Sequence, residues 1–559
     1  MTSPIGKLVR PWSLFLAVAL PAAALAQPAA VAQPASVVQP VSFAGGYAGG
    51  YGIPGTTFTY TTIRLREPEA SLTGRIGQAY NRTDAPDITG LERQGARIRF
   101  EAGGLRFDLN RTATGLQGTV QPPGGVPQPA YFAIRPGAVP VEQVARYEGT
   151  YALGGGRLLS LARNSYGYNL WYLEMPSGRT GFLFNLSSTD RGGDWIGGPC
   201  IFCAGPERLR IRLLPETDAE PGPRIAVTLD GRERTLRRLA TYRAEEVSFT
   251  SRDGTRLTGT LFLPSRGRRH AAVVVTHGSG ATGRNGFNGT IRFIAEAYAR
   301  RGIAALIYDK RGTGSSTGDW ERDGLDDLAD DAAAALRFLA GRADIRADRL
   351  GLSGASQATW VLPMAASRFP GVRILQMRVG SAPMGVEESE RMRLERQMRS
   401  DGFPQSEIEQ ALRIRSMMDD YARTGQNWDS LAAAAEAVKD RLWMTRYIAG
   451  LPARDAPDWP WLREAFAVDV RPDLGRFRGS IQMLYSGKDE LLDPAEPMAM
   501  LRAALRGGAA RDVQIEVIPD ANHNGLDAVE GTEREFPRLQ RYMPGYIDKI
   551  VDWAVRRLR

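Results

Sequence analysis

The chain has 559 residues, of which 43% are hydrophobic and only 24% are charged. This composition excludes an intrinsically disordered protein, because such chains lack the apolar side chains needed to bury a core. Two cysteines are too few to hold a small disulfide scaffold together, so a conventional hydrophobic core is expected. The length predicts roughly three or four domain-sized units.

The net charge of +9 does not indicate a nucleic-acid-binding protein. Nearly all of the positive charge is arginine, and the arginines are interspersed with acids, as in 390–396, instead of forming a basic stripe with aromatic residues between. Net charge that is spread in this way bears on solubility and not on one partner. Nucleic acid is therefore not expected among the binding partners.

The first 26 residues have the pattern of a cleaved signal peptide. Lys7 and Arg10 precede a short apolar run at 12–20, and an Ala-Leu-Ala cleavage site follows at 24–26. The run is shorter than the roughly 20 residues that span a bilayer, so no stable membrane anchor is expected. The mature protein is predicted to be exported, either periplasmic or secreted.

A flexible linker and then a β-rich accessory region are predicted to follow. Residues 27–55 are rich in Ala, Pro and Gln and then in Gly and Tyr, a composition typical of a linker. From 56 to 240, short alternating runs separated by Gly pairs and Asn or Asp turns predict β-strands. The Pro-rich stretch 121–127 divides this region into two candidate units, about 56–122 and 145–240. A packing or binding role is expected for them.

The two cysteines stand in the motif Cys200-Ile-Phe-Cys203. A metal site would need further ligands, and no histidine is near in the sequence. A thioredoxin-like role would need a βαβ context, which the surrounding β pattern does not offer. In an exported chain a local structural disulfide is the leading interpretation, and two unpaired thiols are the alternative.

From about 244 to 559, buried-type strands alternate with amphipathic helices. This alternation predicts an α/β domain with a doubly wound, mostly parallel sheet. Between about 386 and 470 helical patterns replace the alternation, which predicts a helical cap over the carboxyl edge of the sheet. A last helix is expected at 536–557. Ligands of such sheets bind beyond the carboxyl ends of the strands, so functional residues are expected there.

One strand of this sheet runs into Gly-Ala-Ser-Gln-Ala at 354–358, which has the spacing of a nucleophile elbow. The turn from strand to helix is so tight that its neighbours must be small, and it exposes the hydroxyl of Ser356. Ser353 satisfies the same loose pattern, but it would place Gly354 inside the following helix. Ser356 is therefore the predicted nucleophile. Ser353 and an ordinary serine in a strand–helix turn are the alternatives.

The chain has only three histidines from which a catalytic base could come. His523 follows the last strand in a loop rich in Asn and Gly, at the edge where Ser356 is expected, and it is the predicted base. Asp489 follows the preceding strand and is placed to hold the histidine tautomer, with Asp493 as the alternative. His270 stands beside two arginines and is expected at the surface.

An acyl-transfer site also needs an oxyanion hole made of two converging backbone N–H groups. One is expected from Gln357, directly after the nucleophile. The other is expected from the loop 277–280, with Ser279 favoured over Gly280. His277 is expected to orient this loop and not to transfer protons. No metal site and no cofactor are predicted.

A Gly-rich loop at 308–318 follows another strand of the sheet. It lacks the Gly-Lys-Ser/Thr order of a phosphate-binding loop, so that interpretation is weak. A turn-rich loop beside the site, pinned by Asp309 and Arg311, is expected instead.

Together these motifs resemble the α/β-hydrolase superfamily, and they are most similar to its dienelactone-hydrolase-like and serine-aminopeptidase-like esterase branch. The similar segments are His-Gly-Ser-Gly at 277–280, Asp-x-Arg-Gly-x-Gly-x-Ser at 309–316, the elbow, Gly-x-Asp at 487–489 and Asn-His at 522–523. The chain order Ser, Asp, His is also that of α/β-hydrolases. Ala358 and Thr359 depart from the two glycines usual in this branch. The resemblance covers about 245–559.

The sequence thus predicts an exported serine hydrolase that cleaves carboxylic esters through an acyl-enzyme, acting on a small-molecule or peptide acyl substrate. A serine peptidase similar to aminopeptidases or prolyl oligopeptidases is one alternative, although the β region shows no repeat of propeller length. An acyl thioesterase is another. The non-enzymatic alternative is a binding protein that acts through its β domains.

Overall fold

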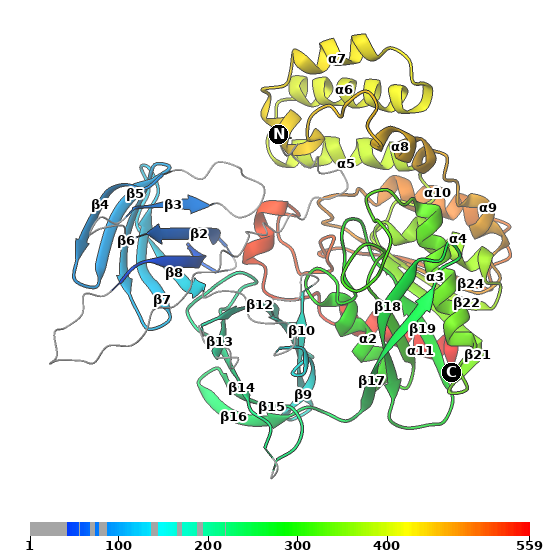
Figure 1. Ribbon diagram of the computed structural model, residues 1–559, viewed down its shortest axis with the longest axis horizontal. Helices are drawn as coiled ribbons and strands as arrows, with labels where there is room; N and C mark the ends of the chain where they lie inside the picture. Colours follow the sequence, from blue (N-terminus) through cyan, green and yellow to red (C-terminus); the bar gives the residue numbers. More distant parts are fainter. Residues whose placement is uncertain are drawn as a thin grey trace, which may run out of the picture.

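Within the residues that it describes, the computed structural model contains three eight-stranded sheets. Figure 1 shows the first sheet at the left, the second below the centre and the third at the right, with a group of helices above the third. The predicted signal peptide lies outside the described residues. The structure describes residues 42–54, 56–66, 73–77, 87–135, 144–164, 170–186, 194–217 and 220–559.

The first sheet is antiparallel, with the strand order β3-β2-β1-β8-β7-β6-β5-β4. Tyr47, Phe107 and Phe132 belong to the apolar cluster that covers one of its faces. Side chains alternate between the two faces of a strand, and on the other face Ala48 and Ala133 pack in a smaller apolar cluster with Phe184 and Ile196 of the second sheet. The strands are β1 (Gly45–Tyr51), β2 (Thr59–Arg66), β3 (Thr73–Gly77), β4 (Thr89–Gln94), β5 (Arg97–Ala102), β6 (Leu105–Arg111), β7 (Gly115–Gln121) and β8 (Gln128–Arg135).

The prediction of a flexible linker at 27–55 is wrong for 45–51, which forms the internal strand β1 between β2 and β8. A Cβ on Gly49 would lie 2.0 Å from the carbonyl oxygen of Tyr131, so glycine permits this close pairing. Tyr47 is 1% exposed and donates its hydroxyl hydrogen to the carbonyl oxygen of Phe43. A segment with the composition of a linker therefore forms a strand. Its glycines allow close pairing with the neighbouring strands, and Tyr47 packs in the core.

The β region forms two separate sheets, but the predicted position of the boundary between them, at 121–127, is wrong. This stretch is the turn between β7 and β8, where the Gln121 side-chain amide donates to the carbonyl oxygen of Gly125 at 3.0 Å. Prolines in such a turn leave the strand ladder intact because they lie outside the paired residues. The first unit extends to the end of β8, and the second sheet begins with β9 (Gly149–Gly154).

The second sheet is an antiparallel meander in which each strand pairs with the next. It curls until its end returns to β9, where the Leu239 N–H donates to the Thr150 carbonyl oxygen at 2.7 Å. We call this unit, residues 144–239, the second barrel, because the second sheet forms it. Large side chains such as Tyr151 and Trp195 fill its interior. Its other strands are β10 (Arg157–Arg163), β11 (Leu170–Met175), β12 (Thr180–Asn185), β13 (Asp194–Gly197), β14 (Leu209–Leu214), β15 (Arg224–Leu229) and β16 (Arg232–Arg237).

The third sheet has the order β17-β18-β20-β19-β21-β22-β23-β24. Strand β18 is antiparallel to both neighbours, and all pairs from β20 to β24 are parallel. This is the doubly wound architecture of an α/β-hydrolase fold. The strands are β17 (Tyr242–Thr250), β18 (Arg256–Pro264), β19 (His270–Val275), β20 (Ala304–Tyr308), β21 (Ile345–Ala355), β22 (Val372–Arg378), β23 (Ser480–Ser486) and β24 (Asp512–Ile518).

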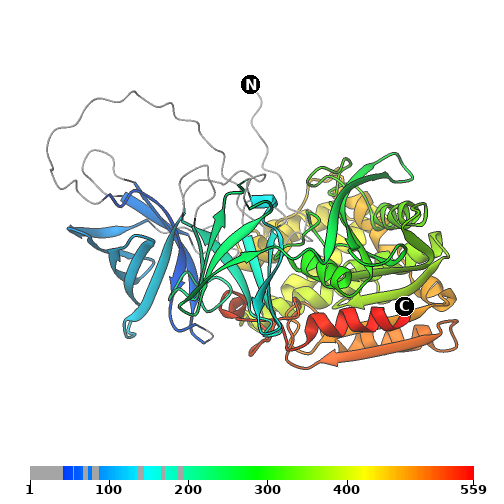
Figure 2. The ribbon, with the colours of Figure 1, turned by 90° about the horizontal axis from the view of Figure 1, so that it is seen from below.

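Helices cover both faces of the third sheet. Alternate residues of β19 point to opposite faces: Val273 packs in the cluster of α2 and α11, and Val274 packs in the cluster of α3 and α4. Figure 2 shows α11 lying along the sheet. The helices are α2 (Thr290–Arg300), α3 (Leu325–Ala340), α4 (Ala358–Arg368), α9 (Arg471–Arg476), α10 (Ala495–Leu505) and α11 (Tyr546–Leu558). His270 at the start of β19 is buried, so its predicted surface position is wrong.

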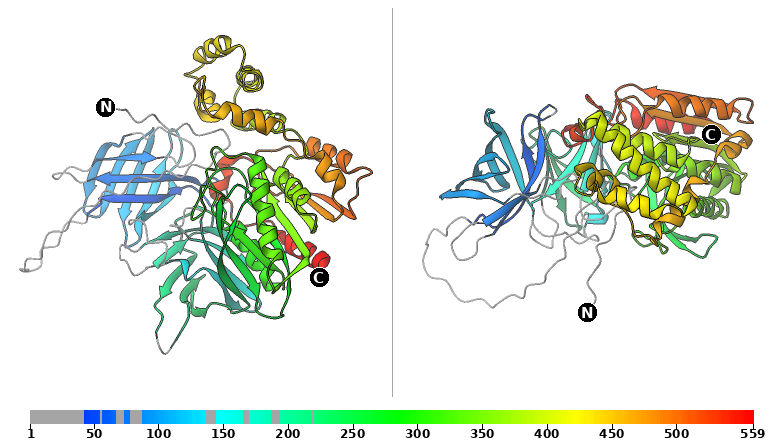
Figure 3. Two further views of the ribbon diagram at one scale, coloured as in Figure 1. Left: turned by 45° about the vertical axis from the view of Figure 1, so that its right-hand side comes forward. Right: turned by 90° about the horizontal axis from the view of Figure 1, so that it is seen from above.

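A helical insertion separates β22 from β23. It is the group of helices that stands above the third sheet in Figure 1 and that Figure 3 shows from two further sides. The rings of Tyr421, Trp428 and Trp459 pack together in its core. Its members are α5 (Val386–Ser400), α6 (Gln405–Thr424), α7 (Trp428–Glu436), the π-helix η1 (Met444–Ile448) and α8 (Asp458–Phe466). Among the described helices, none is long and apolar enough to cross a membrane.

The prediction of a helix over 536–557 is wrong for its first ten residues. Helix α11 begins at Tyr546, after Gly545, whose φ is 71°. A short 3-10 turn, η2 (Glu533–Arg538), and an extended segment precede it. In that segment the backbone of Arg541 forms an isolated antiparallel β-bridge with Arg179 of the second barrel. The apolar side chains of Phe536, Leu539 and Tyr542 pack in one cluster with Phe202 of the barrel instead of on one face of a helix.

A buried charged cluster joins the second barrel to α2. Glu148 of the barrel lies 2.9 Å from Arg163 and 3.1 Å from Arg292, and it accepts a hydrogen bond from the Asn285 side chain. Arg292 also pairs with Glu296 at 2.8 Å. Burial alone would raise the pKa of Glu148, but the two arginines outweigh it and lower the pKa. The barrel and the α/β domain therefore share an interior.

We expect Glu148→Ala to destabilise the protein by about 3 kcal/mol, because it leaves the buried Arg292 and the partly buried Arg163 short of a partner. Urea unfolding followed by tryptophan fluorescence measures the change. The control is Glu101→Ala, which removes an exposed partner of Arg106 and should have little effect. Equal losses in the two variants would contradict a shared, charge-paired interior.

Candidate active site

Ser356 occupies the turn between β21 and α4. Its φ is 58°, in the left-handed region that non-glycine residues rarely adopt and that a nucleophile elbow requires. The turn is as tight as the sequence indicates, because a Cβ on Gly354 would lie 2.4 Å from both Ala358 Cβ and Thr276 Oγ1. The side chain of Ser356 is therefore presented at the carboxyl edge of the sheet.

Backbone hydrogen bonds hold the Ser356 turn in place. Its N–H donates to the carbonyl oxygen of Arg378 at 2.8 Å, and its carbonyl oxygen accepts from the Thr359 N–H at 2.9 Å. Val379, next in the chain after β22, has a φ of 43° and donates its N–H to the Leu484 carbonyl oxygen of β23 at 2.9 Å. A β-branched residue is strained in this conformation, so Val379 adds a second strained backbone position next to the Ser356 turn.

Ser353, the alternative nucleophile, lies inside β21 and is 0% exposed. Its hydroxyl donates to Gln376 Oε1 at 2.9 Å and accepts from Arg378 at 2.8 Å. A hydroxyl committed in this way within the core cannot meet a substrate. Ser356 is partly exposed, and the geometry favours it over Ser353.

His523 and Asp489 pair beyond the ends of β24 and β23. The Nδ1 atom of His523 lies 2.8 Å from Oδ2 and 3.0 Å from Oδ1 of Asp489. The buried carboxylate also accepts the N–H groups of Leu491 and Leu492 at 2.9 and 3.0 Å. It therefore favours the tautomer with hydrogen on Nδ1, which leaves Nε2 free to take a proton. Asp493, the alternative partner, accepts a backbone N–H at the start of α10 instead.

Glu490 places a second carboxylate behind His523. Its Oε2 accepts the His523 backbone N–H at 3.1 Å, and the residue is 5% exposed. Burial and the charge of Asp489 raise the pKa of Glu490 to about 7. Burial alone would lower the pKa of His523, but Asp489 and Glu490 outweigh it and raise the pKa. Glu490 was not identified in the sequence analysis. The one indication in the sequence was its position directly after Asp489.

The loop 277–280, which follows β19, lies against the elbow. A Cβ placed on Gly278 would be 3.5 Å from the Cβ of Ser356. The two backbone donors expected from the sequence belong to the next residues along each segment, Ser279 and Gln357. The structure thus brings together the two segments from which an oxyanion hole is predicted.

His277 is buried at the start of this loop. Its Nε2–H donates to the carbonyl oxygen of Tyr308, and its ring packs edge-on against the Tyr308 ring at 4.7 Å. Burial and the nearby charge of Lys310 lower the pKa of His277 to about 4, so the ring is neutral at neutral pH. These contacts tie the loop to β20 and leave His277 in a structural position.

Lys310 is a second residue that sequence reasoning missed. It is 3% exposed, and its ammonium donates to the carbonyl oxygens of Gly278 at 2.7 Å and Gly280 at 3.0 Å and to Gln357 Oε1 at 3.0 Å. Burial lowers its pKa to about 7. The available signal was residue usage, because only five of the 71 Lys and Arg residues are lysines. A lysine supplies three rotatable donors on a point charge, which arginine cannot reproduce.

Ion pairs hold the rest of the loop 308–318. Asp309 accepts from Arg284 at 2.8 Å, and the buried Arg311 lies 2.6 Å from Asp331 of α3. Both residues expected to pin the loop therefore have charged partners. In the part of the chain that the structure describes, no group of three or more His, Cys, Asp or Glu side chains is arranged to hold a metal ion.

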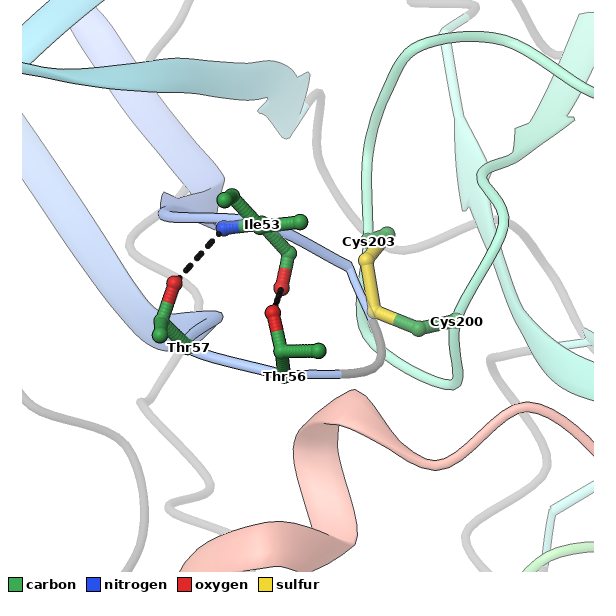
Figure 4. Close-up of a disulfide and its surroundings, with 5 residues drawn as sticks. All are labelled: Ile53, Thr56, Thr57, Cys200 and Cys203. Carbon is green, nitrogen blue, oxygen red and sulfur yellow. Dashed lines mark hydrogen bonds between the residues drawn. A yellow bond between two sulfur atoms is a disulfide. The ribbon is translucent and has the colours of Figure 1, made fainter.

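The second barrel contacts the segment that follows His523. Cys200 and Cys203 form a disulfide, which confirms the leading interpretation of this motif. In the loop that it closes, the Ile201 N–H donates to the Leu539 carbonyl oxygen at 2.7 Å. Figure 4 shows the disulfide loop beside Ile53, Thr56 and Thr57, which lie between β1 and β2.

Backbone hydrogen bonds also connect the second barrel, through residues 542–543, to the loop that carries His523. The Tyr542 N–H donates to the Gly178 carbonyl oxygen of the barrel, and the Met543 N–H donates to the Gly525 carbonyl oxygen, both at 2.9 Å. Gly525 is two residues from His523. The second barrel therefore supports the loop that carries the candidate base.

Residues 253–465 match the model of a family described as X-Pro dipeptidyl-peptidase (S15 family). The match covers less than half of the chain. It includes the loop 277–280 and Ser356, and it ends before Asp489 and His523. Together with the α/β-hydrolase fold, this match supports a hydrolase of the serine type.

Two curated proteins show local sequence similarity. The chain is 32% identical over 114 residues to the uncharacterized protein YfhR of Salmonella typhimurium (strain LT2) and 31% identical over 114 residues to that of Salmonella typhi. Each match covers 20% of this chain and 37% of the relative, so the chain spans little more than a third of the relatives' length.

Three esterases are among the similar solved structures. The Pyrococcus furiosus esterase Pf2001 has 13% identity and a TM-score of 0.37, covering 57% of this chain and 92% of that one. Est1E from Butyrivibrio proteoclasticus, solved with ferulic acid, has 14% identity and a TM-score of 0.35, covering 56% and 97%. Acetyl xylan esterase 1 from Thermoanaerobacterium has 16% identity and a TM-score of 0.35, covering 62% and 87%.

We expect Glu490→Gln to lower the pKa of His523, because it removes a negative charge and keeps an oxygen that can accept the His523 N–H. The imidazole should then become neutral at a lower pH. NMR titration of the histidine ring protons measures this, with the low pKa of His277 as an internal reference. Glu436→Gln, an exposed position on α7, is the control. An unchanged His523 titration in Glu490→Gln would contradict the electrostatic account.

Proposed function

We propose that the protein is an exported serine hydrolase that cleaves carboxylic esters. The observation that carries the proposal is the left-handed turn at Ser356 beside the loop 277–280, on the sheet edge where His523 pairs with Asp489. Serine on such a turn, followed in the chain by Asp and His, is the catalytic order of α/β-hydrolases.

In the proposed mechanism, Ser356 Oγ bonds to the ester carbonyl carbon while its proton moves to His523 Nε2. The N–H groups of Gln357 and Ser279 stabilise the oxyanion, and Asp489 holds the histidine orientation. The bond to the alcohol oxygen breaks as that oxygen takes the proton from His523, leaving acyl-Ser356. Water then gives a proton to His523 and adds to the acyl carbon. Breakage of the bond to Ser356, whose oxygen recovers the proton, releases the acid.

A pocket beside Gln357 supports a short, largely apolar acyl group as the substrate. It is narrow: the space of about 330 Å³ between its lining atoms includes open solvent, and the enclosed part has room for about one water molecule. Its two charged groups are already engaged, Lys310 by its three acceptors and Asp323 by Arg311 at 2.9 Å. The helical insertion closes one side through Trp461, whose indole N–H donates to the Asp323 carbonyl oxygen. The apolar lining residues are Trp320, Leu325, Leu328 and Trp461.

Peptide cleavage is the second candidate function, because the family model matched over 253–465 bears a peptidase description. A relation to prolyl oligopeptidases would bring a propeller of four-stranded blades ahead of the hydrolase. The described β units are eight-stranded sheets instead, which favours the ester proposal over that relation. A purely binding role of the β units would leave the strained serine and the paired histidine without a use.

Export is part of the proposal. Its support is the signal-peptide pattern of residues 1–26, and the Cys200–Cys203 disulfide suits an oxidising compartment. CoA thioesters are cytoplasmic metabolites, so export also favours an ester over a thioester substrate.

We expect the purified protein to hydrolyse p-nitrophenyl esters, with acetate and butyrate preferred over decanoate because the pocket is small. Ser356→Ala should reduce kcat by at least about 1,000-fold, since it removes the nucleophile. Ser353→Ala is the matched control and should stay within about tenfold of the unsubstituted protein, because that hydroxyl bonds to Gln376 and Arg378 in the core and not to substrate. Release of p-nitrophenolate measures the rates.

Trp461→Ala should move the preference toward longer acyl chains, because it opens one wall of the pocket. Undiminished hydrolysis by folded Ser356→Ala would contradict the nucleophile assignment. Turnover of glycyl-proline p-nitroanilide with no turnover of any ester would replace the ester proposal with the peptidase.

A further inference from the structure

Lys310 links the two segments from which the oxyanion hole is proposed. Two of its hydrogen bonds go to the carbonyl oxygens of Gly278 and Gly280, on either side of Ser279. The third goes to the side chain of Gln357, which follows the nucleophile. All three hydrogens of the ammonium are thus used on the two segments that carry the proposed donors.

The bond to Gly278 also orients the neighbouring N–H group. In a trans peptide unit the C=O and the N–H point to opposite sides, and the peptide bond between Gly278 and Ser279 is not among the cis bonds of the chain. Lys310 draws the Gly278 oxygen toward itself, so the Ser279 N–H is directed away from Lys310. Gly278 packs against Ser356, which places that N–H beside the elbow.

We propose that Lys310 is a positioning residue, which holds the Ser279 and Gln357 backbone donors at the spacing that an oxyanion requires. The inference rests on the proposed acyl-transfer function and deepens it by adding a dependence on the charge of Lys310. A neutral amine has two hydrogens and cannot serve three acceptors, so loss of the proton frees one of the three acceptors and loosens the link between the two segments. Its buried charge also lies beside the oxyanion site, where the dielectric constant is low.

The surroundings of Lys310 make that charge sensitive to pH. Burial is the dominant influence and lowers the pKa to about 7, while Asp331 of α3 acts in the opposite direction. Arg311 takes up much of the charge of Asp331 through their ion pair. The titratable and charged groups around Lys310 are His277 after β19, Asp309 and Arg311 in its own loop, Asp323 before α3 and Asp331 in α3. As pH rises past neutrality, the ammonium loses its proton and the rate should fall.

The test compares Lys310→Met and Lys310→Arg with the unsubstituted protein, using p-nitrophenyl acetate from pH 5 to 10. Lys310→Met should lower kcat by roughly 10- to 100-fold, as expected for a loosened oxyanion hole, with KM within about threefold. The alkaline decline of the unsubstituted protein should be absent from both variants, because methionine does not titrate and arginine stays charged. Lys439→Met, at an exposed position, is the matched control and should leave kcat unchanged.

Circular dichroism and thermal unfolding establish that each variant is folded. A folded Lys310→Met variant with kcat within threefold of the unsubstituted protein would overturn the proposal. A decline of activity at alkaline pH that persists in Lys310→Met would also overturn it. If Lys310→Met does not fold, the profile of the unsubstituted protein decides. Constant activity from pH 7 to 9 then overturns the proposal, and a decline that Lys310→Arg removes supports it.

A fluorophosphonate probe separates this proposal from the ester proposal. Its phosphorus bonds to the serine oxygen as fluoride leaves, and the charge that develops on the phosphoryl oxygen needs the same backbone donors. If the unsubstituted protein hydrolyses no ester but is labelled at Ser356, the ester proposal fails alone. Slower labelling of Lys310→Met then supports the role of Lys310, and equal labelling overturns it. No labelling of the unsubstituted protein overturns both proposals.

Discussion

The arrangement of the site depends on the left-handed backbone of Ser356. Such a conformation costs about 1–3 kcal/mol for a non-glycine residue and persists only where the surroundings over-determine it. Here the serine N–H is bound to β22, its carbonyl oxygen is bound within α4, and Gly354 lets Thr276 and Ala358 close in from both sides. The parallel sheet therefore stabilises the strained backbone, and the proposed nucleophile is held in position without a substrate.

Each other part of the site is fixed by a contact from outside its own loop. Asp489 and Glu490 hold the side chain and the backbone of His523, and Lys310 holds the loop 277–280. The second barrel adds the segment after His523, through backbone hydrogen bonds and a disulfide-closed loop. The charged cluster at Glu148 joins that barrel to α2. The accessory region therefore supports the α/β domain at the loop that carries His523.

Local patterns made part of this predictable from the sequence. Strand–helix alternation predicts the third sheet, and small residues around Ser356 predict the elbow, because both follow from short-range geometry. Strand β1 was missed because its glycines suggest a linker, although they serve close strand pairing with β8. The late start of α11 and the role of Lys310 depend on contacts with residues distant in the chain. Backbone carbonyl acceptors such as those around Lys310 leave no pattern in a sequence.

The proposal on which the others depend is that Ser356 carries the acyl group. Its most direct test is to mix the protein with p-nitrophenyl acetate at pH 5, where His523 is mostly protonated and water attack on an acyl-enzyme is slow. Acid quenching, proteolysis and mass spectrometry then locate the acetyl group. The account predicts acetylation of Ser356, absent from Ser356→Ala. Acetylation of Ser353, or the same modified peptide from Ser356→Ala, would contradict it.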